Sequence, residues 1–63
     1  MSSIKVIFRN GNVVCYKNAK LEIDHDQLRN LIKITGKAED RVANRVTDYI
    51  PIMQIERITE IPE

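Results

Sequence analysis

Few residues in this chain have the types and spacing that chemistry requires. Asp24, His25 and Asp26 form the one grouping that resembles a site, because two carboxylates and an imidazole can ligate a divalent metal. Alternate residues of an extended segment point to opposite faces, so His25 would turn away from both carboxylates. We therefore interpret the three residues as a solvated polar turn, and we expect no metal and no other cofactor.

Cys15 is the second candidate for chemistry, as a nucleophile. A nucleophilic thiol needs a base within hydrogen-bond reach, and His25 is the single histidine in the sequence. Nothing in the sequence brings these two residues together, and Cys15 stands in an apolar run, which is typical of a small buried hydrophobe. A lone, unpaired cysteine also fits a reducing cytoplasm, the localisation that we expect.

Residues 35–37, Thr-Gly-Lys, resemble the end of a phosphate-binding loop. The earlier glycine of that motif is missing, and Ala38 stands where a hydroxyl should bind magnesium. We interpret the segment as a turn. With no other catalytic set in the sequence, we expect that the protein is not an enzyme and binds no small-molecule substrate.

The element that organises the chain is a predicted hairpin around residues 9–12, Arg-Asn-Gly-Asn. Asn-Gly between two apolar alternating runs, 4–8 and 13–16, is a strong hairpin signal because both residues tolerate a positive φ. A two-residue turn would set Val6 opposite Cys15. A three-residue turn with a bulged Gly11 would set Val6 opposite Val14. The sequence leaves both registers open.

The size and composition favour one small β domain over residues 1–63. Ten Ile, five Val and three Thr make the chain rich in β-branched residues, which pack well on a pleated surface. A chain this short buries only about 60% of the surface that its unfolded form exposes, so small folds usually need a further source of stability. A single cysteine excludes an internal disulfide, which leaves oligomerisation as the expected source.

The middle of the chain allows two interpretations. Residues 17–20 predict a bend, and residues 21–24 a short strand with one wet face. We favour a second hairpin with arms 31–35 and 45–50 joined by a polar loop over 36–44. The alternative is helical, with apolar residues at helical spacing in 28–35 and a short helix within 38–49.

The end of the chain predicts a turn followed by a last strand. Pro51 cannot donate to a β ladder, so we expect a tight turn over 51–54 and a strand over 55–61. Ile52, Ile55, Ile58 and Ile61 recur every third residue, which suits a bulged or strongly twisted strand. The expected fold is mainly β, a small antiparallel meander or partial barrel of about five strands.

The formal net charge of +1 does not by itself predict nucleic-acid or membrane affinity, but the two ends of the chain differ in charge. Residues 1–20 carry four basic residues and no acid, whereas residues 46–63 sum to −3. One interpretation is that the two ends pair side by side in the sheet. The other is head-to-tail contact between copies of the chain. Met1-Ser2-Ser3 leads directly into a strand pattern, so no signal peptide is expected, and no apolar run is long enough to span a bilayer.

The leading functional hypothesis is a non-enzymatic interaction module that binds another protein or its own copies. The chain has more apolar side chains than one face of a small sheet can bury, and exposed apolar patches mark protein interfaces. The residues expected at the interface are Ile52, Met53, Ile55, Ile58 and Ile61.

The alternative hypothesis is a small β-barrel that binds nucleic acid through the basic N-terminal hairpin. Small barrels bind single strands with basic side chains on the phosphates and aromatic rings on the bases. The residues expected to do this are Lys5, Arg9, Tyr16, Lys17 and Lys20.

Both ends of the chain carry turn residues and apolar spacing that resemble small uncharacterised all-β proteins of Gram-positive bacteria and their phages. The residues that carry this resemblance are Val6, Phe8, Asn10, Gly11, Tyr16, Asn18 and Ala19, then Tyr49, Ile50, Pro51, Ile55, Ile58 and Ile61. The resemblance implies an accessory protein of a bacterium or mobile element. The last strands resemble, more distantly, the ending of Sm-like and SH3-like barrels, but the base-contacting residues of that family are not evident in this sequence.

Overall fold

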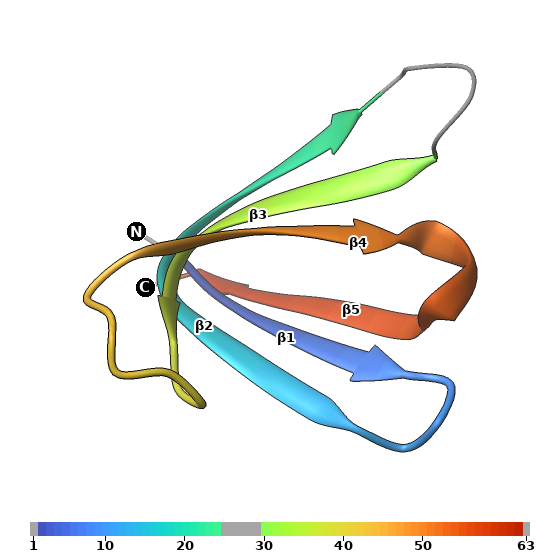
Figure 1. The fold of residues 1–63 in the computed structure, drawn as a ribbon, viewed down its shortest axis with the longest axis horizontal. Helices are drawn as coiled ribbons and strands as arrows, with labels where there is room; N and C mark the ends of the chain where they lie inside the picture. Colours follow the sequence, from blue (N-terminus) through green and yellow to red (C-terminus); the bar gives the residue numbers. More distant parts are fainter. Residues whose placement is uncertain (1, 25–29, 63) are drawn as a thin grey trace.

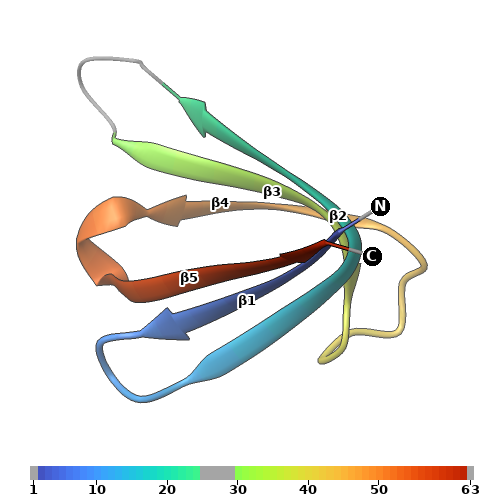
Figure 2. The same cartoon turned by 180° about the vertical axis from the view of Figure 1, so that it is seen from behind.

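The computed structural model describes residues 2–24 and 30–62, which form five antiparallel strands in one sheet. The strands and the 3₁₀ turn that joins the last two are β1 (Ser2–Phe8), β2 (Val13–Asp24), β3 (Leu31–Ala38), β4 (Val46–Pro51), η1 (Ile52–Gln54) and β5 (Ile55–Pro62). Figures 1 and 2 show the strongly curled sheet from its two sides. The mainly β prediction is confirmed.

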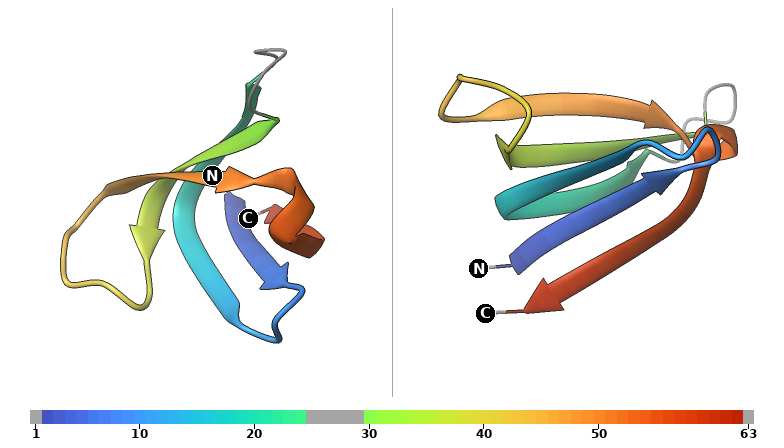
Figure 3. Two further views of the ribbon diagram at one scale, coloured as in Figure 1. Left: turned by 45° about the vertical axis from the view of Figure 1, so that its right-hand side comes forward. Right: turned by 90° about the horizontal axis from the view of Figure 1, so that it is seen from below.

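The strand order is β4-β3-β2-β1-β5. The first four strands form a meander, and η1 then carries the chain across to β5, which pairs with β1. β4 and β5 are the two edges of the sheet, so the sheet curls without closing into a barrel (Figure 3). The helical alternative for the middle of the chain is wrong for the described residues, since 31–38 and 46–51 are strands and 39–45 are turns and bends.

The first hairpin adopts the three-residue turn. Val6 lies opposite Val14, the register that this turn requires. The amide of Gly11 donates to the carbonyl of Phe8 at 3.0 Å, and the amide of Phe8 donates to the carbonyl of Asn12 at 2.8 Å. Gly11 has a φ of +92°, which places it in the region that favours glycine and explains why this residue type occupies the bulge.

β2 is one long strand that bends in the middle. Its first part pairs with β1 and its second part with β3, with a shift in the β3 register between Lys17 and Lys20. Asn18 adopts a φ of +50° at this point, so the bend predicted over 17–20 is present. The bend does not end the strand, however, because the β3 ladder continues on both sides of it. The segments 13–16 and 21–24 are therefore one strand rather than two.

Gly36 lies inside β3 and packs closely against this bend. A Cβ atom on Gly36 would lie 2.8 Å from the Cβ of Ala19 and 2.9 Å from its Cα. The prediction that residues 35–37 form a turn is wrong, because β3 continues to Ala38. Glycine is needed here for the close approach of two strands.

The last connection follows the predicted pattern of a turn and a bulged strand. β4 ends at Pro51, η1 makes one turn, and β5 begins at Ile55. Arg57 lies opposite Ile7 and Ile55 opposite Phe8, so one extra residue of β5 is accommodated in the ladder. This extra residue shifts the alternation of β5 by one position. Ile55 and Ile58 can therefore both face the core although they are three residues apart.

The core lies on the concave side of the sheet. Its most deeply buried side chains are Tyr16, Ile4, Ile34 and Val6. Phe8, Val14, Ala19, Leu21, Val46 and Ile58 pack around the core and are partly buried. No helix within residues 2–24 and 30–62 is long and apolar enough to cross a membrane.

Candidate functional site

The hairpin tip and η1 meet at one end of the sheet, the end opposite the two termini (Figure 1). The amide of Arg9 donates to the carbonyl of Gln54 at 2.9 Å, which fixes the tip against η1. The two segments enclose an open pocket of about 220 Å³. The lining residues of this turn-end pocket are Phe8, Arg9, Asn10, Met53 and Gln54.

The turn-end pocket combines apolar walls with a polar rim. Met53 is 80% exposed and Ile52 is 41% exposed, although both are apolar. The side-chain oxygen of Asn10 accepts a hydrogen bond of 3.0 Å from the amide of Asn12, which fixes the tip further. Among the described residues, no carboxylate forms an ion pair with Arg9. The pocket therefore places apolar side chains beside a guanidinium that has no carboxylate partner among the described residues.

The predicted interface residues do not form one patch. Ile52 and Met53 lie at the turn end, where both are exposed. Ile55 is buried and Ile58 packs against the core, so these two side chains stabilise the monomer rather than offering a surface. Ile61 is 53% exposed but lies opposite Ser3 near the other end of β5. The structure therefore divides these five residues between the turn end, the core and the far end of β5.

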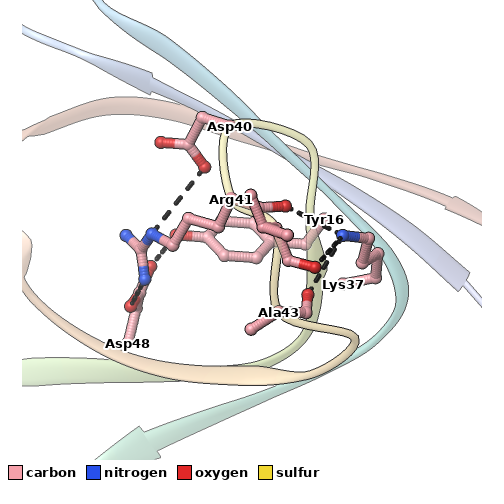
Figure 4. A network of polar contacts seen from close by, with 7 residues as sticks. Tyr16, Lys37, Asp40, Arg41, Ala43 and Asp48 are labelled. Carbon is pink, nitrogen blue, oxygen red and sulfur yellow. Dashed lines mark hydrogen bonds and ion pairs between the residues drawn. The ribbon is translucent and has the colours of Figure 1, made fainter.

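Tyr16, expected to stack on a base, lies in the core instead. Its side chain is 1% exposed, and its hydroxyl donates to the carboxylate of Asp48 from β4 (Figure 4). Arg41 donates from Nη1 to the other oxygen of Asp48 at 2.5 Å, and its Nε lies 3.8 Å from Asp40. This network connects β2 to β4 across the concave side of the sheet. The ring of Tyr16 is therefore not accessible for stacking on a base.

The network fixes the charge state of each member. Burial, then the hydrogen bond and charge of Asp48, raises the pKa of Tyr16, so the phenol stays neutral. Burial on its own would raise the pKa of Asp48, but hydrogen bonds from Arg41 and Tyr16 outweigh it and lower the pKa. The hydrogen bond and charge of Asp48 raise the pKa of Arg41. The arrangement holds an ion pair and a neutral phenol, which is a structural role.

Lys37 also fixes the loop between β3 and β4, through hydrogen bonds to its backbone. Its Nζ donates to the carbonyls of Arg41 at 2.8 Å and of Ala43 at 3.0 Å (Figure 4). The loop is thus fixed by both Lys37 and Arg41, and it presents Val42, which is 97% exposed.

No sequence-based prediction included this network, although one signal in the sequence pointed to it. Val46, Asp48 and Ile50 alternate along one strand and face the same side. A carboxylate in line with two apolar residues indicates a buried charge that needs a partner. The identity of the partners, Tyr16 and Arg41, carries no such local signal because they come from a distant strand and a loop.

The remaining basic residues of the nucleic-acid hypothesis are exposed and lie on β1, on β2 and at the turn end. Lys5 lies on β1 opposite Cys15, and Arg9 lies at the turn end. Lys17 and Lys20 are on β2, where each forms a long ion pair, with Glu39 at 3.7 Å and with Glu22 at 3.6 Å. Exposed pairs of this length contribute little to stability.

The other candidates for chemistry are Cys15 and the group Asp24, His25 and Asp26. Cys15 is free and half-buried on the convex side of the sheet, so it is more accessible than the small buried hydrophobe that the sequence predicts. His25 and Asp26 lie outside the described residues, as does the side chain of Asp24, so the metal hypothesis lies there too. Within residues 2–24 and 30–62, no group of three His, Cys, Asp or Glu side chains could hold a metal ion.

The two oppositely charged ends of the chain are neighbours in the sheet, because β1 pairs with β5. The opposed residues include Lys5 with Thr59, Ile4 with Glu60 and Ile7 with Arg57, and none of these three pairs joins opposite charges. These three pairs therefore contribute no cross-strand ion pair to the contact between β1 and β5.

The fold and the turn-end pocket define the chain as a small, open, five-stranded β protein. Comparisons with protein-family models, with curated proteins and with solved structures returned no match. The resemblance to phage and bacterial β-proteins and to Sm-like or SH3-like barrels therefore stays a prediction.

Proposed function

We propose that this chain is a non-enzymatic interaction module that binds a protein segment, from its own copies or from another protein, at the turn-end pocket. The observation that carries the proposal is the exposure of Met53, which is 80% accessible although it borders a pocket. Methionine adapts its shape to different apolar partners, so it is favoured at binding surfaces.

The pocket has the composition that protein recognition requires. Phe8 and Met53 offer apolar contact area, while Arg9 and Gln54 offer hydrogen-bond donors at the rim. The hydrogen bond between the Arg9 amide and the Gln54 carbonyl holds both sides of the pocket together before a partner binds. A rigid site loses less conformational entropy on binding.

A photo-crosslinking experiment tests the proposal. The photoreactive residue p-benzoylphenylalanine is placed at position 53 or, as a matched control, at position 42. Both positions carry exposed apolar residues, but Val42 lies on the loop at the opposite end of the molecule (Figure 1). Illumination should give a discrete protein adduct from position 53 and none from position 42. Equal adducts from both positions, or none from position 53, would contradict the proposal.

A second candidate function is nucleic-acid binding on the convex side of β2, β3 and β4. Lys33 lies directly opposite Tyr49, which is 57% exposed, and Lys20 lies opposite Thr35 on the same side. An exposed aromatic ring beside lysines suits base stacking and phosphate contact. In this candidate function, the exposed Tyr49 stacks on a base in place of the buried Tyr16.

The test of this second function is the anisotropy of a labelled single-stranded oligonucleotide at several salt concentrations. Binding should weaken as salt increases, and Lys20→Glu with Lys33→Glu should abolish it. Lys5→Glu, on β1, is the matched charge control. Binding that survives the double substitution would contradict a role for this face.

A further inference from the structure

An acidic residue, Glu22, lies among the lysines on the convex side of β2, β3 and β4. We propose that its carboxylate occupies the place of a phosphate group on this surface, so that a single-stranded nucleic acid binds by displacing Glu22 from Lys20 and Lys33. This inference rests on the second candidate function, because it names the group that competes with the ligand for the same surface.

Glu22 lies beside both lysines that would contact phosphate. Its Oε1 is 3.6 Å from Nζ of Lys20, and it lies directly opposite Lys33 of β3. Lys20 and Glu22 are alternate residues of β2, so they project from the same side of the sheet. Directly opposed residues of an antiparallel pair have Cβ atoms about 4.5–5.5 Å apart. Lys33 is therefore the cross-strand neighbour of the Glu22 carboxylate.

The ion pair between Lys20 and Glu22 is readily exchanged for a pair with a ligand. The two side chains are 74% and 49% exposed, and exposed ion pairs contribute little to stability. A phosphate group carries a negative charge as the carboxylate does, and a nucleic acid offers several such groups in a row. Breaking the pair thus costs little and leaves Lys20 charged for a phosphate.

The exposed ring of Tyr49 favours a single strand over a duplex. Tyr49 of β4 lies opposite Lys33 and is 57% exposed, so Glu22, Lys33 and Tyr49 form one row across three strands. The unpaired bases of a single strand can stack on an aromatic ring beside a basic residue. The bases of a duplex are stacked on one another and do not offer their faces to the ring.

Fluorescence anisotropy of a labelled oligothymidine at low salt tests the role of Glu22. Glu22→Gln should tighten binding by about two- to fivefold, which corresponds to the loss of one exposed ion pair. The gain should shrink as salt is raised, because salt screens exposed charges. Glu60→Gln is the matched control, since it removes the same charge from an exposed residue of β5, at the opposite edge of the sheet from β4, and should leave the affinity unchanged. Circular dichroism verifies that both variants fold.

A double-mutant cycle tests whether Glu22 acts through its lysine partner. In a Lys20→Ala chain the ion pair is already absent, so Glu22→Gln should tighten binding less than it does in the wild type. An equal gain in both backgrounds would indicate a general effect of net charge and would overturn the inference.

The outcomes separate this inference from the function on which it rests. Binding that requires Lys20 and Lys33 but responds equally to Glu22→Gln and Glu60→Gln would overturn the competing role of Glu22 and still support nucleic-acid binding. Failure of both the wild type and the Glu22→Gln chain to bind would overturn the two together. A duplex of the same oligothymidine with its complement should bind more weakly, and equal binding of the duplex would overturn the preference for a single strand.

Discussion

Tyr16 is the residue whose role depends most on contacts far away in the sequence. As a sequence position it is an aromatic residue at the end of a basic hairpin, and as a folded residue it is a buried phenol that donates to Asp48. The carboxylate of Asp48 is kept charged by two donors, Tyr16 and Arg41. A partly buried charge with complete hydrogen bonding is tolerated, whereas one with a missing donor is costly.

Tyr16→Phe should therefore lower the free energy of unfolding by about 1.5–3 kcal/mol, the usual range for a hydrogen bond to a charged group. The substitution keeps the ring in the core and removes only the hydroxyl donor. Urea unfolding measures the change. Tyr49→Phe is the matched control, because its ring is 57% exposed, and a comparable loss in the control would contradict the role of the Asp48 contact.

The pKa shifts predict how stability depends on pH. The pKa of Asp48 is lowered in the folded state, so its contribution is present above the unfolded value of 3.8 and is lost as pH falls through the folded value. The pKa of Tyr16 is raised, so its contribution is present below its unfolded value of 10.0 and is lost as pH rises above that value. Thermal unfolding is measured between pH 2 and 5. The Tm of Asp48→Asn should fall less than the Tm of the wild type as the pH is lowered. An equal fall in Tm for the variant and the wild type would contradict the role of the Asp48 carboxylate.

At the scale of elements, the bend in β2 decides how the sheet curls. β2 has 12 residues, and the bend at Asn18 allows one strand to pair with β1 and then with β3. Gly36 makes this possible because Ala19 and the carbonyl of Lys17 lie where its side chain would be. The curl in turn brings η1 and the hairpin tip to the same end of the molecule (Figure 3).

Gly36→Ala should lower the free energy of unfolding by about 2 kcal/mol or more, because the added Cβ would overlap backbone as well as side-chain atoms. Chemical denaturation measures this loss, and Ala19→Gly in the same chain should recover part of it. Gly11→Ala is the contrasting control. Its Cβ would meet no atom within 4 Å, so the cost comes from the positive φ and should be about 1 kcal/mol. Equal losses at both glycines would contradict the packing argument.

At the scale of the whole molecule, the open sheet has three central strands and two edge strands. β1, β2 and β3 each pair with two neighbours, whereas β4 and β5 pair with one. An exposed edge strand offers unpaired backbone groups to solvent or to a partner. The exposed residues of β5, including Ile61, therefore belong to the part of the sheet that is least constrained by its own chain.

Amide hydrogen exchange should follow this order, with the slowest exchange in β1 and the first half of β2 and faster exchange in β5. Mass spectrometry of exchanged peptides at low protein concentration measures it. Protection of β5 equal to that of β1 would indicate that the free edge is covered, and it would contradict an open monomer.

Much of the fold could be predicted from the sequence because the signals are local. Asn10-Gly11 predicts a hairpin, Pro51 ends a strand, and isoleucines spaced by three predict a turn and a bulged strand. The candidate site was predicted only in part, since Met53 and Ile52 are exposed whereas Ile55 and Ile58 are buried. The spacing of apolar residues alone does not predict which of their side chains are buried in the core.

The sequence by itself determined the first hairpin, the turn after Pro51 and the last strand, because turn residues and β-branched residues act on their nearest neighbours. It left strand and helix open in the middle of the chain. It did not determine the roles of Tyr16, Gly36 or Asp48. Each of these roles depends on atoms brought close from another strand: Asp48 for Tyr16, and Ala19 for Gly36. Only the curled sheet decided these contacts and the pocket between the hairpin tip and η1, because they form between segments that are distant along the chain.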